Sequence, residues 1–192
     1  MDAGFPIDED VFSIQFSSSA ASDLRTPVWR AIGLLISNYA KVETALHMYA
    51  RRLSGLDDAK ARVLLSTLRI SEVIARVKSL HLLSGTCASD IAEFEVLSKQ
   101  MQRITEARHL LVHNGVSFIK EDEILTHKKF VSKDATSYPM RDFSLEKLHA
   151  MVDDCGCIAF RLLALCEPQD LQRVLGGHAD DMKAFARSPW RY

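Results

Sequence analysis

The most constraining feature of this sequence is a series of apolar residues that recurs at alternating spacings of four and three between positions 28 and 53. These spacings put every member on one side of an α-helix, so they predict a long helix that packs one face against the rest of the protein. Thr26 and Pro27 predict its start, because threonine is a good N-cap and proline suits the first helical position. Gly55 predicts its end. The series comprises Val28, Ile32, Leu35, Tyr39, Val42, Leu46, Tyr49 and Leu53.

A second amphipathic segment follows in two pieces. Asp57 or Asp58 is a suitable N-cap for the first piece. We expect a break near residues 69–70, after which Ser71 caps a continuation that ends at Gly85.

The rest of the chain indicates two more long helices joined by a segment of different period. Asp90 and Glu93 form a capping box for the third helix, and Ser144 is a good N-cap for the fourth. Between these helices, two runs favour extended structure, residues 116–119 and 124–131. We therefore predict an all-α fold, an up-and-down bundle of four to five helices with a small β-hairpin or irregular insertion after the third long helix.

Charge and hydropathy narrow the functional classes. The 24 Lys and Arg residues almost balance 25 Asp and Glu, so bulk charge does not favour a nucleic-acid coat protein or a membrane-surface binder. No apolar run reaches the ~18 residues of a membrane span, and the acidic N-terminus is unlike a signal peptide. We expect a cytoplasmic protein without a membrane partner. Its parts are a leader (1–25), a helical bundle (26–176) and a C-terminal tail (177–192).

The four cysteines are Cys87, Cys155, Cys157 and Cys166. A cytoplasmic location favours reduced thiols over disulfides. The last three fall in a helical apolar pattern, where cysteine behaves as a small hydrophobic residue, and their spacing is not that of the usual zinc sites. We expect Cys155 and Cys166 on the inner face of the fourth helix as reduced thiols, with no disulfide, no bound metal and no cofactor.

The third helix contains a break in an otherwise regular pattern. Arg108 stands where its apolar series predicts another apolar residue, between Ile104 and Leu111. Because a buried, unpaired guanidinium is very costly, Arg108 must meet an anion or face water, and Glu43 is the best candidate anion on the first helix. If Arg108 and His113 are both helical, their side chains point roughly 140° apart. They converge more easily if the helix ends near residue 112, or if a second subunit contributes.

The residues around this break resemble the HEPN superfamily of small helical-bundle domains. The resemblance covers residues 26–166 and depends on two segments, Arg-His-Leu-Leu-Val-His-Asn-Gly (108–115) and Asn-Tyr-Ala-Lys-Val-Glu-Thr-Ala-Leu (38–46). The family pattern is an arginine, a polar residue that is often asparagine, and a histidine after about three further residues. Here His109 takes the usual asparagine position. In the family a glycine commonly follows the histidine directly, whereas here Asn114 stands between His113 and Gly115.

This resemblance implies a metal-independent endoribonuclease that acts as a homodimer, with two Arg/His pairs facing each other across the interface. Arg108 would stabilise charge on the phosphate, and His113 would act as general acid or base. His109, Asn114 and Glu43 would be binding residues, with Glu43 orienting Arg108. The resemblance also implies RNA as substrate and a toxin–antitoxin or defence role, with an antitoxin protein as a further partner.

Simpler interpretations remain for the same positions. Arg108 can form a structural ion pair with Glu43, and His113 can cap the helix end, where the helix dipole favours positive charge. The protein would then be a non-catalytic HEPN-like module for dimerisation or for binding RNA or nucleotide. His109 and His113 could also bind a metal, but no third ligand accompanies them. The five other histidines, His47 among them, are interpreted as surface residues.

Aromatic residues beyond the needs of one core favour self-association. Trp29, Phe118 and Phe130 fall outside the apolar series of the helices. Surplus apolar surface of this kind is typical of an interface. We expect a two-fold homodimer built around the first long helix and the Arg108–His113 region.

Overall fold

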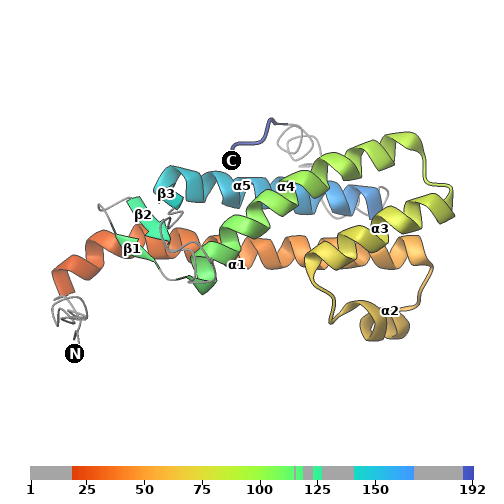
Figure 1. The fold of residues 1–192 in the computed structure, drawn as a ribbon, viewed down its shortest axis with the longest axis horizontal. Coiled ribbons are helices and arrows are strands. Elements are labelled where there is room, and N and C mark those ends of the chain that lie inside the picture. The colour runs from red at the N-terminus through yellow and green to blue at the C-terminus, as the bar shows by residue number, and fades with distance from the viewer. Residues whose placement is uncertain (1–18, 115, 119–122, 127–140, 167–187) are drawn as a thin grey trace, which may run out of the picture.

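The computed structural model describes residues 19–114, 116–118, 123–126, 141–166 and 188–192, which form a helical bundle with a small sheet at one end (Figure 1). The helices are α1 (Ser19–Ser54), α2 (Asp58–Leu65), α3 (Ile70–Ser84), α4 (Ala88–His113) and α5 (Leu145–Cys166). The strands are β1 (Ser117–Phe118), β2 (Glu123–Thr126) and β3 (Arg141–Ser144). The predicted fold class is confirmed. None of the described helices is long and apolar enough to cross a membrane.

The predicted apolar face of α1 is buried along most of its length, where α5 and α3 make its most extensive contacts. The helix begins at Ser19, however, and not at Thr26, so Pro27 lies inside it. Proline at this position leaves one backbone hydrogen bond unmade. The predicted N-cap is wrong because the residues before Thr26 include Ala20 and Ala21, and alanine has the highest helix propensity. The expected boundary between leader and bundle therefore falls within a helix.

Most predicted helix ends agree with the structure. Gly55 and Gly85 follow α1 and α3 with φ angles of +64° and +63°, a conformation that glycine adopts without steric cost. Asp57 caps α2 and Ser144 caps α5, each by accepting a hydrogen bond from a backbone N–H in the first turn.

Two predicted caps are wrong. Helix α3 has Arg69 as its N-cap instead of Ser71, and the Arg69 backbone N donates a 2.7 Å hydrogen bond to a glutamate side chain in the first turn. Helix α4 begins at Ala88, so the capping-box pair lies inside the helix. Glu93 instead forms an ion pair with Arg161 of α5, through contacts of 2.5 and 2.8 Å. The carboxylate of Glu93, which the local sequence pattern assigned to a helix cap, therefore joins α4 to α5.

The insertion is a three-stranded antiparallel sheet in the order β1-β2-β3. Ile124 of β2 pairs with Phe118 of β1 and with Phe143 of β3. The sheet packs on α1 through Trp29, whose ring centroid lies 5.7 Å from that of Phe118. Strand β3 was not predicted from the sequence. It ends at Ser144 and α5 begins at the next residue, so no turn signal separates the strand from the helix. The part of the second predicted strand beyond residue 126, with Phe130, lies outside the described residues.

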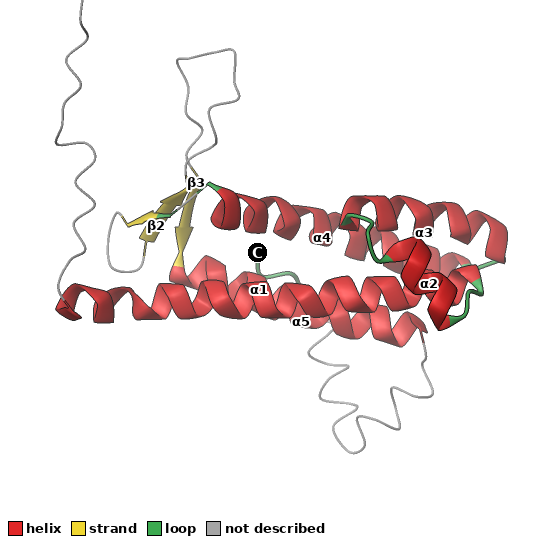
Figure 2. Ribbon diagram, turned by 90° about the horizontal axis from the view of Figure 1, so that it is seen from below, coloured by secondary structure: helices red, strands yellow, loops and turns green. Residues whose placement is uncertain are grey.

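Helix α2 lies to one side of the bundle formed by the four longer helices (Figures 1 and 2). Its inner residues Ala61 and Leu65 are buried, whereas Val63 and Leu64 are 77% and 56% exposed. α2 is therefore an element that packs with one face only.

A buried carboxylate fastens the last described residues to the bundle. Asp154 of α5 is 1% exposed and accepts hydrogen bonds from Gln100 of α4 and from the backbone N–H groups of Arg191 and Tyr192. The Cζ of Arg161 lies 4.9 Å from the centroid of the Trp190 ring. The end of the predicted tail is thus part of the packed structure.

All four cysteines lie within the described residues, and none of them forms a disulfide. Cys155 and Cys166 are buried, as predicted, and Cys157 is buried as well, whereas Cys87 is exposed. Burial raises the pKa of Cys155 to about 12, which keeps this thiol protonated and unreactive at neutral pH.

Candidate functional site

Arg108 is half-buried where α4 meets α1. Its Cζ lies 5.2 Å from the centroid of the Tyr39 ring, so the guanidinium is in cation–π contact with α1. Its Nε is buried and has no hydrogen-bond partner among the described residues. Arg108 therefore brings a positive charge and an unsatisfied donor to this contact.

Tyr39 is held in place by α4. Its hydroxyl lies 2.6 Å from Oγ1 of Thr105, which donates a 2.7 Å hydrogen bond to the carbonyl of Met101. Because Thr105 has one hydroxyl proton and gives it to Met101, Tyr39 is the donor to Thr105. Burial raises the pKa of Tyr39 to about 12, so the phenol stays protonated near neutral pH. The ring is a neutral support for Arg108 and not a candidate general base.

The predicted ion pair between Arg108 and Glu43 is not formed. No described carboxylate lies within ion-pair distance of Arg108. Glu43 is half-buried one turn after Tyr39 on α1. Both Glu43 and Arg108 lie close enough to Tyr39 to act on its pKa, the carboxylate raising it and the guanidinium lowering it. The ring of Tyr39 thus takes the position against Arg108 that sequence reasoning assigned to the carboxylate.

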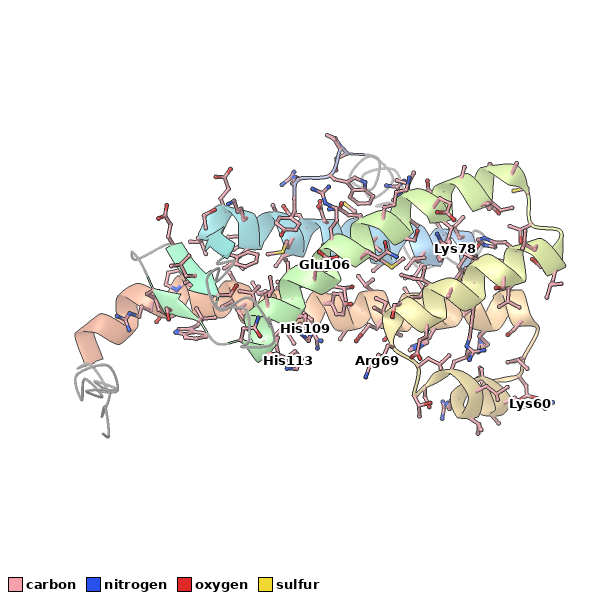
Figure 3. All side chains as sticks on the ribbon, viewed as in Figure 1. Lys60, Arg69, Lys78, Glu106, His109 and His113 are labelled. Atoms are coloured by element: carbon pink, nitrogen blue, oxygen red, sulfur yellow. The ribbon has the colours of Figure 1, made fainter. Side chains whose placement is uncertain are left out.

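His113 and His109 form a separate pair at the end of α4 (Figure 3). Both are exposed, and their ring centroids lie 4.6 Å apart. Figure 3 shows Glu106 near His109 on the same helix, as a spacing of three residues requires. Two imidazoles on the exposed side of a helix end are accessible to a ligand.

Within one chain, Arg108 and His113 do not converge. Helix α4 continues through His113, so the two side chains point roughly 140° apart around the helix axis. Asn114 is the C-cap, and its backbone N donates a 3.1 Å hydrogen bond to the carbonyl of Leu110. The helix thus ends at His113, one residue beyond the end at which the two side chains would converge more easily. Of the predicted site residues, Arg108 and Glu43 share the surroundings of Tyr39, and the histidines lie apart from them.

Sequence reasoning missed Tyr39 as a site residue and misjudged two histidines. Tyr39 lies within the segment that carries the family resemblance, one turn before Glu43, but its apolar spacing indicated only a core position. His81 is 5% exposed, and His47 has a buried Nε2. A signal for His81 was present, because it follows Val77 by one helical turn on the buried face of α3.

The described residues contain no group of three or more His, Cys, Asp or Glu side chains that could hold a metal ion. The chemistry that this region offers is therefore a cation fixed on an aromatic ring and a pair of exposed imidazoles.

Comparison with protein-family models, with curated proteins and with solved structures finds no match for this chain.

Proposed function

We propose that this chain is an HEPN-like, metal-independent endoribonuclease that acts on RNA as a homodimer. The observation that carries the proposal is Arg108, a half-buried guanidinium with no carboxylate within ion-pair distance among the described residues. A cation without a counter-charge among the described residues is suited to bind phosphate, since guanidinium donors match phosphate oxygens. The resemblance of residues 38–46 and 108–115 supports the same proposal.

The proposal requires a second copy of the chain. Because Arg108 and His113 diverge around α4, a site that uses both needs Arg108 from one protomer and His113 from the other. Apolar side chains suited to such a contact are exposed on α1 and at the end of α4: Trp29 (51%), Ile36 (40%) and Val112 (42%). A two-fold axis near these residues would supply the contact from the same patch on both protomers.

In the proposed reaction, the 2′-hydroxyl of RNA attacks the adjacent phosphorus, and the bond to the 5′-oxygen of the next nucleotide breaks. His113 of the other protomer takes the proton of the 2′-hydroxyl, and water gives a proton to the leaving oxygen, after which the imidazolium returns its proton to solvent. Arg108 stabilises the negative charge on the non-bridging oxygens, with Tyr39 holding its guanidinium in place. His109 and Asn114 bind the phosphate and the flanking strand.

Cleavage of RNA by the purified chain, with a chelator present, tests this proposal. Arg108→Ala and His113→Ala should each lower the cleavage rate by roughly 10²–10⁴-fold, as expected for charge-stabilising and acid–base groups. Arg76→Ala and His149→Ala are matched controls, because both residues are exposed and lie on α3 and α5. These controls should cleave at the wild-type rate.

Mixing the two inactive variants tests the composite site. If Arg108 and His113 of one site come from different protomers, heterodimers of Arg108→Ala and His113→Ala contain one intact site. A random mixture should then regain about a quarter of the wild-type activity. A mixture that stays inactive, although it exchanges subunits, would contradict a site built across the interface.

The alternative is a non-catalytic HEPN-like module for dimerisation or for binding RNA or nucleotide. The contact of Arg108 with Tyr39 favours it, since this contact gives the guanidinium a structural role. Wild-type protein that leaves a broad panel of RNA substrates intact between about pH 6 and about pH 8 would support this alternative and reject the nuclease.

The proposed biological setting is a toxin–antitoxin or defence system, with an antitoxin protein as partner. Expression of the wild-type chain alone should then arrest growth, whereas Arg108→Ala should be tolerated. Equal toxicity of the two chains would contradict a toxin that acts through this site.

A further inference from the structure

An exposed tryptophan lies on α1 beside the small sheet (Figure 1). Trp29 is 51% exposed, and its ring centroid lies 5.7 Å from that of Phe118 on β1, with the ring planes at 65°. Because the two rings meet edge to face, Phe118 covers at most one face of the indole. Phe118 is itself packed against the hydrophobic core. The fold therefore fixes the indole and leaves it accessible to a ligand.

The surroundings of this ring are positively charged. The Cζ of Arg25, one helical turn before Trp29, lies 4.8 Å from the centroid of the Phe118 ring. Arg25 and Arg30 are exposed, and neither forms an ion pair with a described residue. From residue 24 to residue 42, α1 contains no Asp or Glu. This part of the surface therefore presents cations without carboxylates from the same helix.

Trp29 lies on a side of α1 that leads towards Arg108. Positions 29, 36 and 43 are seven residues apart, so they share one side of the helix. Glu43, the last of them, shares the surroundings of Tyr39 with Arg108. Trp29 precedes Tyr39 by ten residues, which is about 15 Å along the helix axis. A strand bound at Arg108 can therefore extend along α1 to Trp29.

Charge decides between the two kinds of partner that an exposed tryptophan fits. In a two-fold contact through this ring, Arg25 and Arg30 of one protomer approach the same residues of the other, and like charges repel. An anion that carries planar rings is instead attracted by the cations and stacks on the indole. A nucleic-acid strand has both features, and the bases of a single strand are free to stack on a protein ring. The protomer contact proposed above has Ile36 and Val112 available without Trp29.

We propose that Trp29 is a stacking platform for one base of a single-stranded RNA, at a subsite that flanks Arg108. Arg25 contacts a phosphate next to that base, and Phe118 supports the indole. Such a platform accepts any base, because every base has a π-face. The subsite rests on RNA as the ligand of the proposed function, but it does not require cleavage.

Fluorescence anisotropy with the full chain tests the ligand class. The labelled probe is a single-stranded 2′-O-methyl RNA, which lacks the attacking hydroxyl and is not cleaved by the proposed reaction. It should bind at least about fivefold more tightly than the same backbone without bases or than a blunt duplex, the effect of one base stack. No binding of the probe, or equal binding of the strand without bases, would overturn the proposal. A chain that passes this test but cleaves no RNA rejects the proposed reaction and leaves the subsite in place.

Variants of α1 test where the base lies. Trp29→Ala should weaken binding of the probe at least about fivefold, whereas Trp29→Tyr, which keeps an aromatic face, should retain most of the affinity. Arg25→Ala should also weaken binding and should lower its dependence on salt, because one phosphate contact is lost. Leu82→Ala and Arg76→Ala are matched controls, an exposed apolar residue and an exposed cation on α3. Both should bind as the wild type does.

Two further measurements separate stacking from assembly. The chain has two tryptophans, so in Trp190→Phe the only indole is that of Trp29, and the unlabelled strand should quench its fluorescence. Sedimentation of Trp29→Ala should match that of the wild type at the same concentration. The proposal is overturned if Trp29→Ala binds the probe normally or if the strand does not quench. It is also overturned if Trp29→Ala loses dimerisation together with binding, which would assign the ring to the protomer contact.

Discussion

Arg108 and Arg161 are half-buried arginines in the bundle, and their charges are accommodated in different ways. Arg161 makes two contacts with Glu93, of 2.5 and 2.8 Å, and its Cζ lies near the Trp190 ring. Arg108 has the ring of Tyr39 beneath it and no described carboxylate within ion-pair distance. Their removal should therefore have different consequences for stability.

Arg108→Ala should lower the free energy of unfolding by about 1 kcal/mol or less, because a cation–π contact of this kind contributes roughly 0.5–1 kcal/mol. Arg161→Ala should lower it by about 1–3 kcal/mol, since it leaves the half-buried Glu93 without its partner. Urea denaturation of both variants at one protein concentration measures the difference. A larger loss for Arg108→Ala would indicate that this residue has an ionic partner in solution.

His81 should make the stability of the fold depend on pH. Burial lowers the pKa of His81 below its ordinary value of 6.5. Its Nε2 lies 2.9 Å from the hydroxyl of Tyr49, so these two atoms share a hydrogen bond. Protonation of the ring would bury a positive charge in this part of the core.

Below about pH 6.5 the unfolded chain therefore binds more protons at His81 than the folded chain does. The stability that neutral His81 contributes is lost as the pH falls through that value. Above it, the contribution is fully present. The His81→Gln variant should flatten the loss in urea melts between about pH 5 and about pH 8, while His149→Gln, at an exposed position, should not. An unchanged slope in His81→Gln would mean that other groups cause the pH dependence.

At the scale of helices and strands, glycine has opposite roles in two places. Gly85 follows α3 with a φ angle of +63°. Gly33 lies inside α1, and a Cβ added there would meet no atom within 4 Å among the described residues outside its own helix backbone. Only the first position requires a residue without a side chain.

Gly85→Ala should lower the free energy of unfolding by about 1–2 kcal/mol, the cost of a left-handed conformation for an L-residue. Gly33→Ala should raise it by about 0.5–1 kcal/mol, because alanine loses less conformational freedom in a helix. Urea midpoints of the two variants should move in opposite directions. Loss of stability in Gly33→Ala would show that this side of α1 is closely packed in solution.

At the scale of the whole molecule, the exposed side of α1 predicts assembly. Wild-type protein should sediment as a dimer at about micromolar concentration, and Ile36→Arg should shift it towards monomer by placing a charge in the contact. Leu82→Arg is the matched control, since Leu82 is 85% exposed at the end of α3. A wild-type monomer at this concentration would count against the dimer and against a composite site.

Much of the fold could be predicted because helices leave local signals. The apolar spacing identified the buried face of α1, and Gly55, Gly85, Asp57 and Ser144 marked helix ends by local backbone chemistry. The start of α1 and the caps of α3 and α4 were wrong, since several residues near each end can serve as a cap and packing selects among them.

For the candidate site, helical spacing was enough to show that Arg108 interrupts an apolar series and that His109 and His113 share one side of a helix. The folded chain was needed to show that Tyr39, and not Glu43, meets Arg108, and that Asp154 fastens the last residues. The physical reason is that periodicity describes one helix at a time. Which side chains meet between helices depends on where the helices cross, and that depends on the packing of the whole core.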